Sequence, residues 1–359
     1  MFNEKSIHVR LLNLISRTIA YKIQKMRSKN YLMQNNPLQE FEFEKLSHQY
    51  EKLNNADKSF GVSTLWSKLE KNIYFESFPL KIDFLHDKTL SSVFGKGHPD
   101  FNLEKMLNEI VINFKSNYQL IEELLVENLP GLPLLFRNPI AVNNKQIRTS
   151  ANKLTHLWQL SLIYSSLQNH VGNHPPRLDY LVEWGGGYGG LAYLCKKIWP
   201  QCTIVIIDLP IVCQIQAIYL ESLINGSTYI INQESDALSE NKINLINTNL
   251  LNTGDGGFIT ENSKDNSNNK ILNMLKYKKP DFFVSAWALT ESSIESQKFV
   301  EVNRYFDSAF GFIAYQDHNK THEASLYTSK KLTENGKIIV KDVVPLFNVI
   351  SEKYICWQN

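Results

Sequence analysis

The stretch Leu181-Val182-Glu183-Trp184-Gly185-Gly186-Gly187-Tyr188-Gly189-Gly190 decides the fold of this chain. An apolar run, Asp179 to Trp184, leads into it, and a run with helical spacing, Leu191 to Trp199, follows it. A second apolar run, Thr203 to Ile207, then ends at Asp208. This order predicts a strand, a glycine turn, a helix and a second strand that ends on an acid, which is the pattern of a βαβ nucleotide-binding unit.

The glycines predict close contact between the backbone and a ligand. Without a Cβ atom, glycine adopts positive φ and leaves room beside the chain. The helix that follows begins with unpaired N–H groups and the positive end of its dipole, which favour negatively charged ligand atoms. Asp208 can accept hydrogen bonds from a ribose. Around this unit we expect cofactor contacts from Glu183, Gly185, Gly186, Gly187, Tyr188, Asp208 and Leu209.

Two glycine patterns fit the turn. Gly185, Gly187 and Gly190 satisfy G-x-G-x-x-G of dinucleotide-binding proteins, whereas Gly185, Gly187 and Gly189 satisfy E-x-G-x-G-x-G of S-adenosyl-L-methionine (SAM) methyltransferases. Glu183 favours SAM, because its carboxylate would repel a pyrophosphate and help anchor the cationic end of SAM. Two alternatives remain. One is an NAD-binding oxidoreductase, and the other is a catalytically inactive fold that serves as a binding module.

Two segments carry a resemblance to a known family. Val182–Ala192, followed by Val205–Pro210, resembles the sugar O-methyltransferase family, and Asp281–Glu291 resembles that family's fourth-strand motif. Ser292 stands where the family has methionine, which weakens any role assigned to Glu291. The resemblance implies a class I SAM-dependent O-methyltransferase that methylates a sugar hydroxyl of a surface polysaccharide, a nucleotide sugar or a glycosylated metabolite. A non-sugar small-molecule acceptor is the alternative.

Composition agrees with a globular enzyme. The chain has 359 residues, 43% of them hydrophobic, and its formal charge of +2 gives no reason to expect nucleic acid as a partner. No apolar run reaches the roughly 18 residues of a membrane span. Cys195, Cys202, Cys213 and Cys356 show no C-x-x-C spacing, and we expect buried free thiols in a reducing cytoplasm.

The pattern divides the chain into a helical N-terminal region, 1–149, and a SAM-binding domain, 150–359. The resemblance implies that the helices before the glycine turn cover the cofactor and line part of the acceptor pocket; dimerisation is another role open to them. The first 32 residues combine basic side chains with a helical apolar stripe that includes Ile19, Ile23 and Met26. We favour a stripe packed on the domain or on a second subunit over one lying on an anionic membrane.

The remaining runs predict an α/β fold with a Rossmann-like class I methyltransferase sheet, mainly parallel with one antiparallel strand. Ile243–Ile246 is favoured over Thr228–Ile231 as the third strand beside the cofactor, since Asn249 would then lie near the adenine. Ser285, at the end of the fourth strand, is the last expected cofactor contact. Asn252–Asn269 is polar and is expected to be a surface insertion. The last strands are expected at Asp281–Ser285, Phe310–Tyr315, Ile338–Val340 and Tyr354–Trp357.

Three side chains are candidates for removing the acceptor proton. His318 and Asp317 follow the fifth strand, and Glu291 follows the fourth. His318 is the first choice because an ordinary histidine pKa suits proton abstraction near neutrality. Glu291 is equally well explained as the cap of a helix that begins near Ser292. Two histidine pairs, His170/His174 and His318/His322, have a spacing that could place two metal ligands on one helix face. They do not form a zinc signature, and a bound Mg²⁺ ion stays a possible prediction from the sequence.

Overall fold

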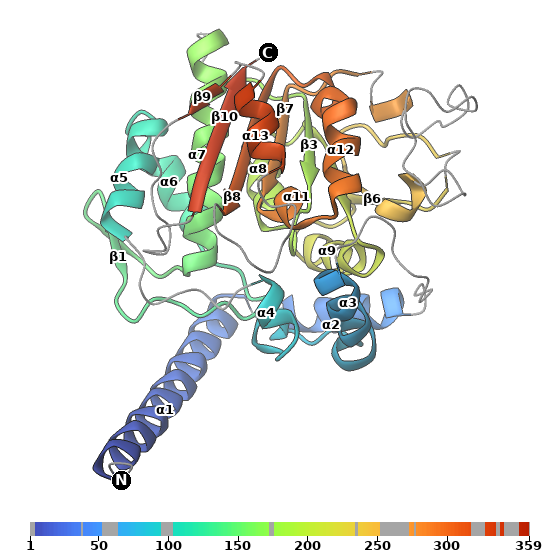
Figure 1. The fold of residues 1–359 in the computed structure, drawn as a ribbon. Coiled ribbons are helices and arrows are strands. Elements are labelled where there is room, and N and C mark those ends of the chain that lie inside the picture. The colour runs from blue at the N-terminus through green and yellow to red at the C-terminus, as the bar shows by residue number, and fades with distance from the viewer. Residues whose placement is uncertain are drawn as a thin grey trace.

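The computed structural model consists of a sheet with helices on both faces and a helical N-terminal region (Figure 1). In Figure 1 the helices α2, α3 and α4 lie beyond one end of the strands. The structure describes residues 4–36, 39–51, 64–94, 103–171, 176–233, 236–251, 273–275, 278–316, 327–334, 338–340 and 352–358. The polar insertion expected at 252–269 lies outside these residues.

The sheet has eight strands in the described part of the chain, in the order β5-β6-β4-β3-β7-β8-β10-β9. Strand β10 runs antiparallel to β8 and β9, and all other neighbours are parallel. The predicted sheet, mainly parallel with one antiparallel strand, is confirmed. The bounds are Tyr180–Trp184 for β3, Thr203–Asp208 for β4, Thr228–Ile231 for β5, Ile243–Asn247 for β6, Phe282–Ala286 for β7, Phe310–Gln316 for β8, Ile338–Val340 for β9 and Glu352–Gln358 for β10.

The choice of the third strand is also confirmed. Strand β6 pairs directly with β4, with Asn247 opposite Asp208, and β5 lies outside it at the edge. The carboxyl end of β6 therefore lies beside the carboxyl end of β4, where Asn249 was expected.

Helices cover both faces because the central strands are apolar on both sides. In β3, Leu181 belongs to a core with α7, α8 and α9, whereas Val182 belongs to a core with α12 and α13 on the other face. These helices are α7 Ala151–Val171, α8 Gly190–Ile198, α9 Pro210–Leu223, α11 Ala288–Glu291, α12 Ile294–Val302 and α13 Tyr327–Glu334.

The N-terminal region shares the core of the sheet domain. Helices α2 and α3 contact α9, and α5 and α6 contact α7. Phe43 and Met106 belong to the same hydrophobic cluster as Leu154 and Ile218. The boundary predicted at 149/150 falls directly before α7. The helices are α1 Glu4–Asn35, α2 Gln39–Glu51, α3 Thr64–Ser77, α4 Leu90–Phe94, α5 Leu103–Asn113 and α6 Tyr118–Leu125, with a short 3-10 turn η1 at Phe84–His86.

One part of this region is not helical as expected. Strands β1 (Ile140–Val142) and β2 (Lys145–Ile147) form an antiparallel hairpin. Its turn residues, Asn143 and Asn144, have φ of 42° and 70°. Asparagine tolerates positive φ and supports two-residue hairpin turns, so the Asn-Asn pair was the available signal.

Helix α1 contacts the body through polar side chains and through Leu32, which is buried with Leu129 and Leu132, but not through the apolar stripe of Ile19, Ile23 and Met26. Gln24 and Lys25 bind Leu135 and Asp83, while Ile19, Ile23 and Met26 are 52%, 41% and 58% exposed. The expectation that this stripe packs on the domain is wrong for these three residues, because the opposite face of the helix makes the contact. Figure 1 shows α1 projecting from the body with the N-terminus at its far end. Among the described helices, none is both long and apolar enough to cross a membrane.

The glycine turn and α11 approach each other closely. A Cβ atom built on Gly185 would lie 1.9 Å from the Cβ atom of Ala288, and Gly185 has φ of +76°. Only glycine therefore allows α11 to reach the turn at this distance.

We expect Gly185→Ala to destabilise the fold more than Gly226→Ala. Gly226 also has positive φ, +69°, but nothing lies within 4 Å of its built Cβ. The difference between the two variants in the free energy of unfolding measures the crowding against Ala288. We expect this crowding to cost about 1–3 kcal/mol. Urea unfolding of both variants without added ligand measures it; equal losses would contradict the close approach of α11.

Candidate functional site

The candidate site lies at the carboxyl ends of β3, β4, β6 and β7. From β3 the chain continues into β4 on one side, and β7 pairs with β3 on the other. The end of β3 is therefore a topological switch point, where open α/β sheets bind their ligands.

The turn after β3 has the backbone that the sequence predicts. Gly185, Gly187 and Gly189 have φ of 76°, 56° and 94°. The N–H group of Gly185 donates to the carbonyl of Ile207 at 2.8 Å, which holds the turn against the end of β4. A Cβ atom built on Gly187 meets only Phe94, at 3.9 Å. Gly187 is therefore the position where the backbone leaves room for a ligand.

Other glycines of the turn make room for the protein itself. A Cβ atom on Gly186 would lie 2.7 Å from the side chain of Ile206, and one on Gly190 would lie 2.4 Å from the ring of His156. The expectation that the glycines as a group leave space for a ligand is thus too broad, because these two are needed for packing.

Asp208 fastens the turn to helix α9. Its Oδ2 atom accepts the N–H group of Gly186 at 3.0 Å and the amide of Gln216 at 2.8 Å, and its Oδ1 atom accepts the N–H group of Leu209 at 2.8 Å. Gln216 also donates to the carbonyl of Gly187 at 2.9 Å. Burial raises the pKa of Asp208 to about 7, while these hydrogen bonds act to lower it. Gln216 was not foreseen, since nothing in the sequence distinguishes it from Gln214 in the same apolar helix.

Glu183 lies beneath the turn. Its side chain is 2% exposed, and its Oε2 atom has no hydrogen-bond partner. A Cβ atom on Gly186 would lie 3.3 Å from this oxygen. Burial, followed by the charge of Asp208, raises the pKa of Glu183 to about 8. The carboxyl group is therefore mostly protonated at pH 7, and the charged carboxylate expected from the sequence is disfavoured at this buried position.

The other expected cofactor residues lie at the same edge. Leu209 precedes α9 and donates to Asp208. Asn249, in the 3-10 turn η2 (Thr248–Leu251) after β6, donates its N–H group to Asn247 at 3.1 Å.

Ser285 is fully buried, and its hydroxyl group already has two partners. It donates to the carbonyl of Trp184 at 2.9 Å and accepts the N–H group of Leu289 at 2.9 Å. In this arrangement its side chain joins β3, β7 and α11.

Aromatic rings of the N-terminal region and of helix α9 surround Tyr188 of the turn. The ring of Tyr188 lies 6.1 Å from Phe84, 6.0 Å from Phe94 and 4.9 Å from Tyr219, measured between ring centroids. His156 of α7 lies 5.4 Å from the same ring. Burial, followed by the charge of Lys153, lowers the pKa of His156 to about 3, so this imidazole is neutral.

Glu291 lies at the end of α11, next to the segment that approaches Gly185. Burial raises the pKa of Glu291 to about 7, and a hydrogen bond from Trp66 of α3 acts to lower it. The alternative that Glu291 caps the next helix is wrong: α12 begins at Ile294, and the side chain of Ser293 accepts the N–H group of Ser296 at 3.3 Å. Trp66 was not foreseen, because only the folded chain brings α3 to this edge.

Two of the three candidate bases cannot be compared with Glu291. His318 and Asp317 lie outside the described residues, as do His174 and His322 of the histidine pairs. Within the part of the chain that the structure describes, no three histidine, cysteine, aspartate or glutamate side chains form a group that could hold a metal ion. The Mg²⁺ ion stays a prediction. Cys195, Cys202 and Cys213 are buried free thiols, as expected, whereas Cys356 is only half-buried.

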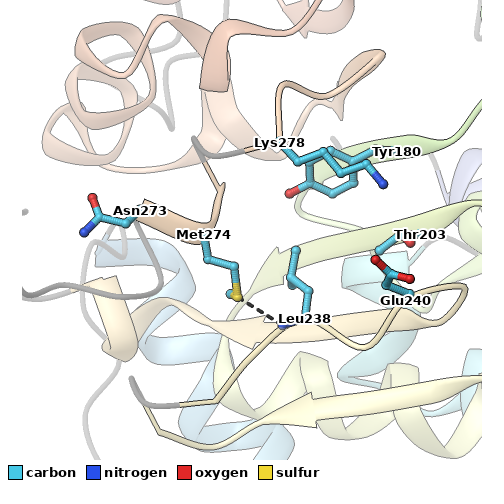
Figure 2. A pocket seen from close by; sticks show the side chains of 7 residues that line it. All are labelled: Tyr180, Thr203, Leu238, Glu240, Asn273, Met274 and Lys278. Atoms are coloured by element: carbon cyan, nitrogen blue, oxygen red, sulfur yellow. Dashed lines mark hydrogen bonds between the residues drawn. The ribbon is translucent and has the colours of Figure 1, made fainter.

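A separate cavity of about 530 Å³ lies at the opposite edge of the sheet. Figure 2 shows it between Tyr180 and Thr203, the first residues of β3 and β4, with Leu238 and Met274 on another side. The N–H group of Leu238 donates to the sulfur of Met274 at 3.1 Å. Because this cavity lies at the amino ends of the strands, it is not part of the candidate site.

Comparisons with known proteins give structural neighbours of low similarity. No family model and no curated protein matches the sequence. An O-methyltransferase family protein from Burkholderia thailandensis is 10% identical with a TM-score of 0.32, covering 57% of this chain and 58% of its own. Magnesium protoporphyrin IX methyltransferase from Synechocystis, solved with bound S-adenosylhomocysteine, is 9% identical with a TM-score of 0.34, covering 58% and 84%.

A SAM-dependent methyltransferase from Aquifex aeolicus is 15% identical with a TM-score of 0.30, covering 50% of this chain and 81% of its own. With TM-scores this low, these likenesses carry no argument about the ligand or substrate of this chain. The fold assignment therefore depends on the order and direction of the strands, and the function has to be argued from the site itself.

Proposed function

We propose that this chain is a class I SAM-dependent O-methyltransferase that transfers a methyl group to a sugar hydroxyl. The observation that carries the proposal is the group formed by Glu183, the turn Gly185–Gly187 and Asp208 at the switch point. The unpaired buried oxygen of Glu183 suits a cationic group above the turn. Asp208, at the end of the next strand, suits the hydroxyl groups of a ribose.

The charge of the ligand distinguishes SAM from NAD at this site. A cation near Glu183 would lower the pKa of its carboxyl group and gain an ionised partner. A pyrophosphate would keep the same carboxyl group neutral and gain no charge interaction from it. Two buried carboxyl groups beside one turn therefore favour the cationic ligand.

Glu291, which follows the carboxyl end of β7, also suits proton removal. SAM supplies a methyl group that is already activated on a sulfonium, so the protein has to align the acceptor oxygen and accept its proton. A carboxyl group with a pKa of about 7, as in Glu291, is suited to accept a proton near neutral pH. His318 and Asp317 remain proposed bases on the sequence argument.

The sugar acceptor is proposed from the resemblance of Val182–Ala192 and Asp281–Glu291 to the sugar O-methyltransferase family. An acceptor within polysaccharide biosynthesis, a nucleotide sugar or a glycosylated metabolite would fit it, with a non-sugar small molecule as the alternative. We place the reaction in the cytoplasm, because buried free thiols suit a reducing compartment.

We expect Asp208→Asn to lower the affinity for SAM at least tenfold. A lost hydrogen bond to a charged group costs about 1.5–3 kcal/mol, and a tenfold change corresponds to about 1.4 kcal/mol. Asp281→Asn is the matched control, since Asp281 accepts the N–H groups of Asp179 and Tyr180 at 2.7 and 2.9 Å at the opposite edge. Calorimetry with SAM, S-adenosylhomocysteine and NAD measures both variants.

Equal SAM affinity in Asp208→Asn and the parent would remove the ribose assignment. Binding of NAD without binding of SAM would show that the site takes the other nucleotide.

We expect Glu183→Gln to change how stability depends on pH. In the folded chain the pKa of Glu183 is about 8, against an ordinary value of 4.5. Between these pH values the folded state binds more protons than the unfolded state, so the parent loses stability as pH rises. The Gln variant has no such loss. Its free energy of unfolding, compared with that of the parent, should therefore rise from pH 5 to pH 8 by on the order of a few kcal/mol.

Urea unfolding at several pH values, without ligand, measures this gain, with the exposed Glu240→Gln as the control. A parent and a Gln variant with the same pH dependence would mean that Glu183 is ionised in the folded chain. With the fold intact, Glu183→Gln should also bind SAM more weakly.

We expect Glu291→Gln to lower turnover by about 10²–10⁴ while SAM affinity hardly changes. Trp66→Phe removes the hydrogen bond that lowers the pKa of Glu291, so the rise of kcat/KM with pH, near 7 in the parent, should move to higher pH. Glu295→Gln, on the neighbouring helix α12, is the control. The assay follows a labelled methyl group from SAM into a panel of sugars and nucleotide sugars, with and without EDTA.

Full activity of Glu291→Gln together with loss of activity in His318→Ala would assign the base to His318. Activity that EDTA abolishes and Mg²⁺ restores would assign the acidification of the hydroxyl to a metal ion.

A further inference from the structure

A cavity of about 300 Å³ lies between α1 and the segment that leads into the β1–β2 hairpin. Two hydrogen bonds hold its walls together. Ser28 of α1 accepts the N–H group of Leu135 at 3.1 Å, and Gln24 donates to the carbonyl of Leu135 at 2.7 Å. The cavity is therefore built from two segments that are more than a hundred residues apart in the sequence and fixed to each other.

Three arginines line this cavity. Arg27 comes from α1, Arg137 from the segment before β1, and Arg148 from the residue after β2. The guanidinium of Arg148 lies 5.6 Å from the centre of the Tyr31 ring, a contact that restricts its orientation. Arginine presents several donors in a planar fork, so three exposed arginines that line one cavity suit an oxyanion.

The positive charge of the cavity is not balanced by acids. No aspartate or glutamate is among its lining residues. In the described part of the chain, no ion pair joins any of the three arginines to a carboxylate. Nearby cations behave differently: Lys25 pairs with Asp83, and Lys145 pairs with Glu122.

We propose that Arg27, Arg137 and Arg148 bind the phosphate group of a phosphate ester. A phosphate offers several oxygen atoms to donors that approach from three directions, which matches arginines from three segments. The cavity is also lined by the apolar side chains of Ile23 and Phe136. An organic ester would contact these side chains, whereas a free inorganic ion would leave them without a partner.

The surroundings fit two sources of such a phosphate. Arg148 also lines a neighbouring pocket of about 900 Å³ that carries amide side chains, among them Asn35, Gln119 and Gln146, together with the acidic side chains of Glu122, Glu123 and Glu127. Amides and carboxylates suit the hydroxyl groups of a sugar, so the sugar of a sugar phosphate would lie in this pocket and its phosphate beside the arginines. Ile23, which lines the cavity, is also partly exposed, and it continues on α1 into the exposed Ile19 and Met26, which suit the chains next to a phospholipid headgroup. The phosphate ester is the chemistry that both sources share.

The test uses the full chain with single variants Arg27→Gln, Arg137→Gln and Arg148→Gln. Lys29→Gln is the matched control, because Lys29 is an exposed cation of α1 that does not line the cavity. Calorimetry measures binding of inorganic phosphate and glucose 1-phosphate, and sedimentation measures binding to phosphatidylcholine vesicles with and without phosphatidylglycerol. Each arginine variant should bind about tenfold more weakly than the parent, and Lys29→Gln within about twofold of it.

The outcomes separate the two sources. Arginine-dependent binding of glucose 1-phosphate supports a soluble ester, and arginine-dependent binding only to vesicles that contain phosphatidylglycerol supports a lipid headgroup. The proposal would be overturned if the parent bound neither glucose 1-phosphate nor vesicles that contain phosphatidylglycerol. It would also be overturned if Lys29→Gln lost as much affinity as the arginine variants. Circular dichroism confirms that the variants fold, and no measurement involves SAM, so the result is independent of the proposed methyl transfer.

Discussion

The hydrogen bonds accepted by Asp208 hold the candidate site together. One carboxylate receives the N–H group of the glycine turn at Gly186, the N–H group of Leu209 and the amide of Gln216. Helix α9 begins at this point and packs against α2 and α3. The same carboxylate thus fixes the turn and the helix on which the N-terminal region rests. Each carboxylate oxygen has two lone-pair sites, so a ribose hydroxyl can share Asp208 with the donors that already hold it.

The N-terminal region completes the site instead of forming a separate unit. Phe84 and Phe94 contact Tyr188 of the turn, and Trp66 donates a hydrogen bond to Glu291. The strands supply the ends at which ligands bind. Burial raises the pKa of Glu291 there, and the hydrogen bond from Trp66 of α3 acts to lower it. An acceptor at this edge would therefore meet residues from both parts of the chain.

The sheet could be predicted from the sequence because its signals are local. Runs such as Ile338–Val340 match a strand residue for residue, and the glycine turn has the predicted positive φ. The β1–β2 hairpin also has a local signal, the Asn143–Asn144 pair at its turn. The protonation of Glu183 and the contact of Trp66 with Glu291 have no local signal, since burial and partners from distant segments create them. The arginine cavity is of the same kind, because its walls are distant in sequence.

The titratable groups around the turn all shift toward their neutral forms. Burial raises the pKa of Glu183 to about 8 and that of Asp208 to about 7, and it lowers the pKa of His156 to about 3. Without a ligand, this edge of the sheet therefore carries less charge than its residue types suggest. A cationic ligand reverses the shift at Glu183, because it stabilises the ionised carboxylate. Binding of such a ligand near neutral pH would then release a proton from Glu183, whereas an anionic ligand would leave the proton in place. On the proposed function, the buried carboxyl group would therefore select ligands by charge although it is mostly neutral without one.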